Sequence, residues 1–267
     1  MEWQDVAFLQ KNWIKKTAWI LANILTFSSL ILAITGIILT FFNLNNFNFW
    51  FAKIMAICSI FDFADGKLAR ISGSKKLAVD IDTIVDSIAF GVFPAIYLGY
   101  TVSAWEIEIW NIVAGVFTGL VYLGAVWFRL YRFVKRDPFY TPYFNGLPSP
   151  FAGMVVACLV IFPDTKEWVT MISAIIISGF MLSKIPFPSF KGVPSKFDMF
   201  WIVSTTLFVV LFAVFPFNPN WMVYPAYGIA ALMILYLIGG PGYAMKLDER
   251  LRLGQHEKTE KKNKSEQ

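Results

Sequence analysis

Acidic residues interrupt two otherwise apolar stretches between Asp62 and Asp86. Asp62 and Asp65 are three residues apart, and Asp82 and Asp86 are four apart, so on helices each pair shares one face. An ionised carboxylate is costly in hydrocarbon unless it faces water or a cation. Carboxylate oxygens from two helix ends are hard ligands. The spacing therefore predicts a divalent-cation site formed by these four aspartates.

Small residues and an arginine follow the first aspartate pair. Gly66 and Ala69 are about one helical turn apart and leave room for a ligand to approach the backbone. Arg70 is a natural partner for a phosphate. Together with the carboxylates, these residues indicate metal-assisted chemistry on a phosphate. The alternative interpretation is that intramembrane aspartates pair with Lys or Arg for structure, or couple ions or protons in a transporter.

The composition indicates a polytopic membrane protein with an all-α helix bundle. Of 267 residues, 57% are hydrophobic and 15% are charged, a balance unlike that of a soluble domain. Apolar segments of roughly spanning length recur and predict about eight transmembrane helices. They cover Thr17–Phe42, Phe49–Arg70, Leu77–Val102, Ile109–Phe133, Pro150–Phe162, Trp168–Lys184, Phe197–Phe215 and Trp221–Gly239.

Basic residues lie in alternate loops and predict the orientation. They precede the first span, separate the second from the third, follow the fourth, link the sixth to the seventh and fill the end of the chain. By the positive-inside rule both termini are cytosolic, and the aspartates lie at the cytosolic face of the cell (inner) membrane. Residues 1–16 read as an interfacial amphipathic helix, 17–245 as the membrane domain and 246–267 as a charged cytosolic tail.

Charge and reactive residues narrow the function further. The net charge of +5 suits anionic lipid headgroups, and no nucleic-acid motif is present. Cys58 and Cys158 lie within predicted spans and read as small hydrophobic residues. The one histidine, His256, lies in the polar tail. A general base in the membrane domain is therefore expected to be a carboxylate.

The stretch from Asp62 to Asp86 resembles the signature of the CDP-alcohol phosphotransferase family, D-x2-D-G-x2-A-R-x8-G-x3-D-x3-D. Two positions depart from it: seven residues rather than eight follow Arg70, and Ala78 stands where the family has glycine. An eight-residue spacing would replace the third aspartate by Thr83, so Asp82 and Asp86 are taken as the third and fourth aspartates. The resemblance implies one or two Mg²⁺ or Mn²⁺ ions on the four aspartates and Asp86 as the catalytic base.

Three further segments resemble the integral-membrane phosphatidylserine synthase branch of that family: Phe90–Ala95, Phe144–Pro150 and Ser183–Lys191. The first is expected to kink or thin its helix, and the second to form a re-entrant turn. The branch implies transfer of a phosphatidyl group from CDP-diacylglycerol to the hydroxyl of L-serine, with release of CMP and no covalent intermediate. It also implies membrane lipids as partners and a homodimer.

The resemblance also assigns substrate contacts. Asn23 and Thr26 match a nucleotide-contacting pair, although ordinary interhelical hydrogen bonds explain them equally well. Gly66, Ala69 and Arg70 are assigned to the CDP-lipid. The serine carboxylate needs a cation, and the candidates share a predicted cytosolic position: Arg129, Arg132, Lys184 and Lys191. The alternative for these cations is snorkelling to lipid phosphates or an ordered turn.

Other functions remain open at this point. The nearest alternative is a sibling enzyme that makes archaetidylserine, or one that uses glycerol phosphate, inositol phosphate or choline as the acceptor. A phosphorylated acceptor would demand an extra basic cluster. A transporter predicts ion-dependent flux without release of CMP. A family member with only a scaffolding role predicts metal binding without turnover.

Overall fold

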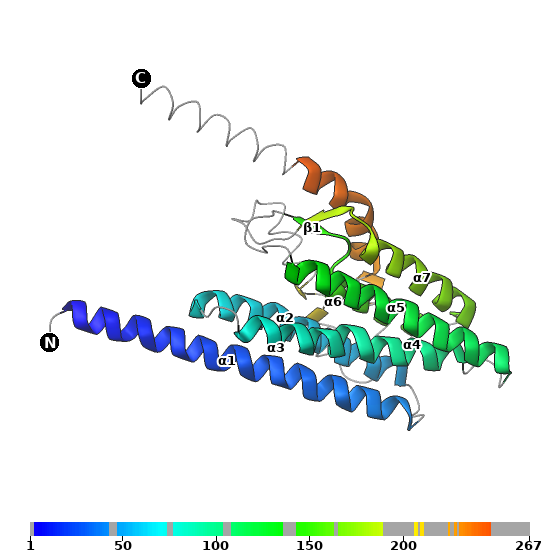
Figure 1. Cartoon of the computed structure of the whole chain (residues 1–267), viewed down its shortest axis with the longest axis horizontal. Helices are drawn as coiled ribbons and strands as arrows, with labels where there is room; N and C mark the ends of the chain where they lie inside the picture. Colours follow the sequence, from blue (N-terminus) through cyan, green and yellow to red (C-terminus); the bar gives the residue numbers. More distant parts are fainter. Residues whose placement is uncertain are drawn as a thin grey trace, which may run out of the picture.

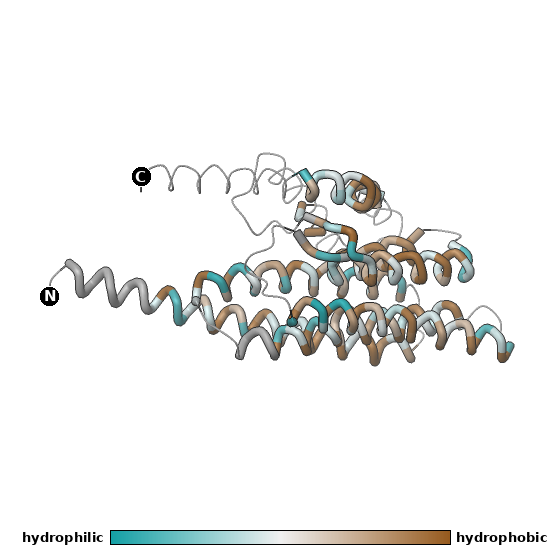
Figure 2. The backbone as a smooth tube through the Cα atoms, turned by 45° about the horizontal axis from the view of Figure 1, so that its top comes forward, coloured by the Kyte–Doolittle hydropathy of each residue, from teal (hydrophilic) through white to brown (hydrophobic). Residues whose placement is uncertain are grey.

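The computed structural model describes residues 3–42, 47–73, 77–103, 108–135, 143–162, 165–188, 206–207, 209–210, 224, 227–228 and 230–246. These residues are almost entirely helical (Figure 1), which confirms the predicted all-α class. Apolar residues dominate the helices along their length (Figure 2). Large apolar side chains are exposed on the outside of the helices as well as buried between them, as expected of helices that face lipid.

Within the described residues, four helical segments are long and apolar enough to cross a membrane, and they match the first four predicted spans. Helix α1 runs over Trp3–Thr40, α2 over Phe47–Ser72 and α5 over Ile109–Lys135. Between α2 and α5, α3 (Leu77–Asp86), the π-helix η1 (Ser87–Val92) and α4 (Phe93–Ser103) follow one another without a break. The candidate spans are Trp13–Thr40, Phe47–Ser72, Ile81–Ser103 and Ile109–Lys135. The chain is an integral membrane protein by these helices.

The N-terminal boundary predicted at residue 16 is not marked by a break in the backbone. Helix α1 continues through Lys16 and Thr17 as one element of 38 residues. Trp13, Lys15 and Lys16 are all exposed on it. The interfacial placement of residues 1–16 stays a prediction.

The remaining helices are shorter. Helix α6 (Ser149–Ile161) has 13 residues and α7 (Glu167–Leu182) has 16, where the fifth and sixth spans were predicted. Residues 230–246 are helical and overlap the end of the eighth predicted span. Most of the seventh predicted span, Phe197–Phe215, lies outside the described residues. The structure thus supports four spanning helices and two shorter apolar ones, while the full count of eight stays a prediction.

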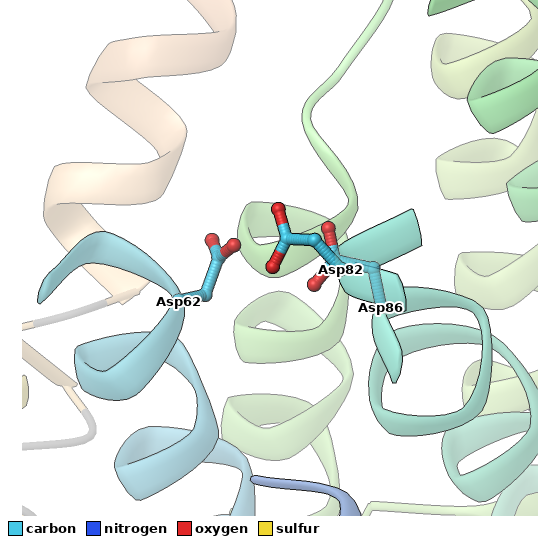
Figure 3. Close-up of side chains that lie close together, drawn as sticks. All are labelled: Asp62, Asp82 and Asp86. Atoms are coloured by element: carbon cyan, nitrogen blue, oxygen red, sulfur yellow. The ribbon is translucent and has the colours of Figure 1, made fainter. Parts of the chain in front are cut away.

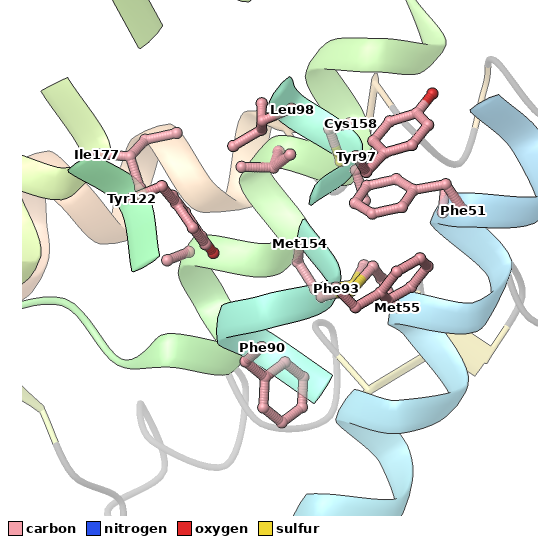
Figure 4. Close-up of a cluster of buried hydrophobic side chains, with 14 of the residues drawn as sticks. Phe51, Met55, Phe90, Phe93, Tyr97, Leu98, Tyr122, Met154, Cys158 and Ile177 are labelled. Atoms are coloured by element: carbon pink, nitrogen blue, oxygen red, sulfur yellow. The ribbon is translucent and has the colours of Figure 1, made fainter. Parts of the chain in front are cut away.

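An aromatic cluster joins α2 to α4 in the core (Figure 4). The ring of Phe51 stacks on that of Tyr97 with centroids 3.9 Å apart and lies 5.0 Å from Phe93. The Tyr97 hydroxyl donates a hydrogen bond to Asn48 Oδ1, and Asn48 Nδ2 donates to the Val160 carbonyl of α6 at 2.9 Å. Buried polar groups need such partners. This contact therefore fixes three helices together within an apolar core.

Small residues let α4 and α5 approach closely. A Cβ atom added to Gly119 would lie 2.6 Å from the Ala95 carbonyl oxygen, and one added to Gly99 would lie 3.3 Å from the Gly115 oxygen. Stripes of small residues of this kind are typical of helix pairs in membranes, where packing replaces the hydrophobic effect. This packing anchors the downstream part of the same continuous helix whose upstream part carries Asp82 and Asp86.

The predicted irregularity at Phe90–Ala95 is a π-helix that begins directly after Asp86. Pro94 has no amide hydrogen and cannot continue the ordinary ladder. The Phe93 N–H instead donates to the Ile88 carbonyl, five residues back. π-segments inside α-helices are frequent at functional sites. Here the segment follows the acidic turn directly, and both it and α4 pack on α5.

A short strand, paired with a second one, begins the turn predicted at Phe144–Pro150, and residues 146–148 then lead into α6. Strand β1 (Tyr143–Asn145) pairs antiparallel with β2 (Pro186–Pro188), with Phe144 opposite Phe187. The sequence did not predict the ladder because two prolines in β2 argue against a strand interior. At the end of β1, Gly146 has φ +83° and donates its N–H to the Ile185 carbonyl at 2.9 Å.

Gly146→Ala is expected to destabilise the protein by about 1–3 kcal/mol, because a side chain is strained at this φ. The added Cβ would also lie 2.7 Å from Arg132 Nη2 and 3.0 Å from the Ser183 oxygen. Thermal unfolding in detergent measures the effect. Gly124→Ala is the matched control, since its Cβ would meet nothing within 4 Å. An equal Tm for the two variants would contradict this account of Gly146.

Candidate active site

Three of the four predicted metal ligands come together. Asp62 reaches from α2, and Asp82 and Asp86 from α3, toward one point between the helices (Figure 3). One carboxylate oxygen of each lies within 4.8 Å of the others. All three side chains are half-buried. The site forms because the two helices lie side by side with their acidic turns at the same level.

Asp65 is placed differently from the other three. It is 4% exposed, and its Oδ2 accepts a hydrogen bond from Thr26 Oγ1 of α1 at 2.8 Å. Its Oδ1 is buried without a hydrogen-bond partner. It still borders the cluster, because it lies about one helical turn after Asp62 on α2. The structure therefore groups three aspartates and ties the fourth to α1.

The predicted nucleotide pair has partners within the protein. Thr26 is buried and bonded to Asp65, which is the interhelical role considered as its alternative. Asn23 is half-buried, and its Nδ2 donates to the Trp19 carbonyl at 3.0 Å. Contact of either residue with a nucleotide stays a prediction.

The backbone of α2 is open next to the acidic cluster. A Cβ atom added to Gly66 would meet nothing within 4 Å. Arg70 is exposed, and its Nε donates to the Gly66 carbonyl at 3.0 Å. Ala69 is half-buried. Among the described residues, nothing thus fills the space beside Gly66, and the Arg70 guanidinium is bonded to its carbonyl.

A buried arginine faces the aspartates from α5. Arg129 is 8% exposed, and its Nη1 donates a 2.6 Å hydrogen bond to Ser149 Oγ at the start of α6. The guanidinium also interacts electrostatically with Asp86 and Asp62. The hydrogen bond that Arg129 donates to Ser149 goes to a hydroxyl rather than to a carboxylate. Arg129 therefore adds a positive charge near the aspartates without occupying their oxygens through that bond.

The other predicted acceptor cations have different surroundings. Arg132 Nη2 donates to the Asn145 carbonyl at 2.5 Å and to the Met181 carbonyl at 3.0 Å, and Nη1 donates to Leu182 at 3.1 Å. It therefore fastens β1 to the end of α7. Lys184 is exposed, and Lys191 lies outside the described residues.

Two site residues were missed from sequence. Ser149 is fully buried against Arg129, although only the glycine–proline turn before it was noted. Tyr236 is 2% exposed and interacts electrostatically with Arg129 from the C-terminal helical segment. The Gly-Leu-Pro-Ser run offered a weak signal for the first. Nothing local to Tyr236 distinguished it from other aromatic residues of an apolar span.

The donor set fits a divalent cation. When ionised, three carboxylates around one point repel one another, and a single guanidinium supplies only one compensating positive charge. Oxygen ligands of this kind are those that Mg²⁺ and Mn²⁺ prefer. The unpartnered Asp65 Oδ1 beside the trio is a further oxygen without a donor. The residues present therefore suit a bound dication better than an ion pair.

Comparison with known proteins agrees with this chemistry. A family model described as CDP-alcohol phosphatidyltransferase matches residues 19–181. A CDP-diacylglycerol--serine O-phosphatidyltransferase of Helicobacter pylori (strain ATCC 700392 / 26695) is 29% identical over 236 residues, covering 83% of this chain and 90% of that protein. The enzyme of the same name from Bacillus subtilis (strain 168) is 34% identical over 132 residues, covering 49% and 70%.

Proposed function

Because the chain belongs to the CDP-alcohol phosphatidyltransferase family, we propose that it transfers a phosphatidyl group from CDP-diacylglycerol to the hydroxyl of L-serine, releasing CMP. The observation that carries the proposal is the trio Asp62, Asp82 and Asp86, whose oxygens lie within 4.8 Å of one another opposite the buried Arg129. The names of relatives such as the Helicobacter pylori enzyme, which is similar over 83% of this chain, support serine as the acceptor.

Each acidic residue has a role in this reaction. A divalent cation on Asp62, Asp82 and Asp86, with Asp65 at its border, would offset charge on the diphosphate of the CDP-lipid. Asp86 accepts the proton of the serine hydroxyl as the new bond from that oxygen to the lipid-bearing phosphorus forms. The bond from phosphorus to the CMP oxygen breaks in the same step. No residue is left covalently modified.

The open face of α2 receives the CDP-lipid. Gly66 and Ala69 allow the nucleotide to lie against the backbone, and Arg70 pairs with a phosphate oxygen at the exposed edge. Asn23 and Thr26 lie on α1, and Thr26 supports Asp65 through its hydrogen bond. Thr26 thus acts on the site through an acidic residue even where it does not reach the nucleotide.

Arg129 is the cation that we assign to the serine carboxylate. Of the four candidates, it is buried, faces Asp86 and keeps N–H groups beyond the one bonded to Ser149. A guanidinium offers five donors in a fixed fork, which suits a carboxylate. The location that we propose is the cytosolic face of the cell membrane, with both termini cytosolic, and a homodimer as the resemblance implies.

Release of CMP from purified protein tests the function. The protein is incubated in detergent with CDP-diacylglycerol, Mn²⁺ or Mg²⁺ and one acceptor at a time: serine, glycerol phosphate, inositol phosphate or choline. Serine-dependent CMP and a phosphatidylserine product are expected. Preference for another acceptor would assign a sibling activity. Metal binding without CMP would indicate a scaffold, and ion-dependent flux in vesicles without CMP would indicate a transporter.

Removal of divalent metal is expected to abolish CMP release, and added Mn²⁺ or Mg²⁺ should restore it. The physical reason is that the carboxylate oxygens of Asp62, Asp82 and Asp86 lie within 4.8 Å of one another, so the ionised groups repel unless a dication lies among them. Mn²⁺ binding followed by electron paramagnetic resonance gives a readout independent of turnover. Asp82→Asn should weaken that binding at least about tenfold. Full activity in chelator would contradict the assignment.

A further inference from the structure

The C-terminal helical segment brings an aromatic residue to the arginine site from beyond the family match. The match ends at residue 181, whereas Tyr236 lies in the segment 230–246. Its side chain is 2% exposed. In Figure 1 this orange segment lies against the side of the bundle that carries β1 and α7. The residue is therefore part of the interior, although its helix is not part of the matched region.

Two ring stacks fix the position of Tyr236. Its ring centroid lies 4.5 Å from that of Phe151, with 17° between the planes, and 5.4 Å from that of Phe187, with 23° between them. Stacks of this kind are directional as well as apolar. A buried phenol ring with two stacked neighbours has little freedom to move.

The two stacking partners belong to the elements that flank Arg129. Phe151 is two residues after Ser149, which accepts the 2.6 Å hydrogen bond from the guanidinium. Phe187 pairs across the ladder with Phe144, whose ring centroid is 5.9 Å from Arg129 Cζ. Tyr236 thus contacts both α6, which bonds the guanidinium through Ser149, and the β1–β2 ladder, which places Phe144 beside it. Tyr236 also interacts electrostatically with Arg129.

We propose that Tyr236 is a positioning residue for Arg129. It holds the guanidinium so that the remaining N–H groups donate to the carboxylate of the acceptor amino acid. The proposal rests on the proposed function, in which Arg129 binds the serine carboxylate. A phenol hydroxyl accepts a hydrogen bond from a guanidinium N–H, and Ser149 holds another N–H of the same group. Acceptor preference is then set partly by the C-terminal segment, outside the region that the family shares.

Tyr236→Phe tests this because it keeps both ring stacks and removes only the hydroxyl. The Michaelis constants for serine and for CDP-diacylglycerol, kcat and Tm are measured on the full-length enzyme, together with turnover of serinamide, which lacks the carboxylate. The KM for serine is expected to rise about tenfold, because the variant loses one hydrogen bond to a charged group. The KM for CDP-diacylglycerol and kcat should change less than about twofold, and Tm by no more than a few degrees. The preference for serine over serinamide should fall by about tenfold, the same factor as the rise in the KM for serine.

The matched control is Tyr227→Phe. Tyr227 is also a tyrosine of the C-terminal part that packs on a phenylalanine, Phe162, but it is 52% exposed. Its variant should retain the wild-type serine preference. An unchanged KM for serine in Tyr236→Phe, or equal losses with serine and serinamide, would overturn the positioning role while the wild-type activity stands. Wild-type protein without serine-dependent CMP release would instead overturn the proposed function and this inference with it.

Discussion

Asp86→Asn is expected to lower serine-dependent CMP release by about 10²–10⁴-fold, the usual contribution of a general base. Asparagine has the same shape, but its amide cannot take a proton from the attacking hydroxyl. The change also removes one of three crowded negative charges at Asp62, Asp82 and Asp86. The variant should therefore fold at least as well as the wild-type protein, and the loss should be in kcat.

Single-turnover release of CMP with saturating serine and Mn²⁺ measures this effect, and Tm in detergent reports on folding. Glu108→Gln is the control, since it removes an exposed carboxylate just before α5. It should leave the rate unchanged. Turnover of Asp86→Asn within a few-fold of the wild-type rate would refute Asp86 as the base. It would leave the metal-ligand role of the trio to be judged by Mn²⁺ binding.

Arg129→Lys should produce the second large loss, about 10–100-fold in kcat/KM for serine, corresponding to the 1.5–3 kcal/mol of a charged hydrogen bond. Lysine keeps the positive charge near Asp86 and Asp62 but not the planar fork. It cannot bond Ser149 and a carboxylate with the geometry of a guanidinium. The loss should appear in the KM for serine rather than in that for CDP-diacylglycerol.

Arg132→Lys separates this specificity effect from a structural one. Arg132 donates to backbone carbonyls of Asn145, Met181 and Leu182. Its variant should lower Tm and leave the ratio of serine to serinamide turnover unchanged. If Arg132→Lys shifts that ratio and Arg129→Lys does not, the carboxylate site has been assigned to the wrong arginine.

The sequence predicted the parts of this site that depend on local spacing. Asp82 and Asp86 share a face because they are four residues apart, and Gly66 leaves the backbone open because glycine has no side chain. It also predicted Arg129 as a candidate, but only among four cations. These features follow from helical periodicity within one element.

The remaining features depend on contacts between distant residues. Thr26 bonds Asp65 across 39 positions, and Ser149 bonds Arg129 across 20. Arg132 was predicted to bind an acceptor because its position and charge resemble those of Arg129. Only the ladder of β1 and β2 shows that its N–H groups are taken by carbonyls. Periodicity cannot reveal which partner a buried polar group will find.

The π-helix over Ser87–Val92 sets the rotation about the helix axis between the face that carries Asp86 and the face that packs on α5. An α-helix turns about 100° per residue, and the wider winding accommodates an additional residue in this stretch. Asp86 upstream can then face Asp62 while Gly99 downstream meets Gly115. Deleting a single residue here would swing one face roughly a quarter of a circle away from its neighbour. The count of residues between the acidic turn and the glycine stripe is thus as binding a constraint as their identity.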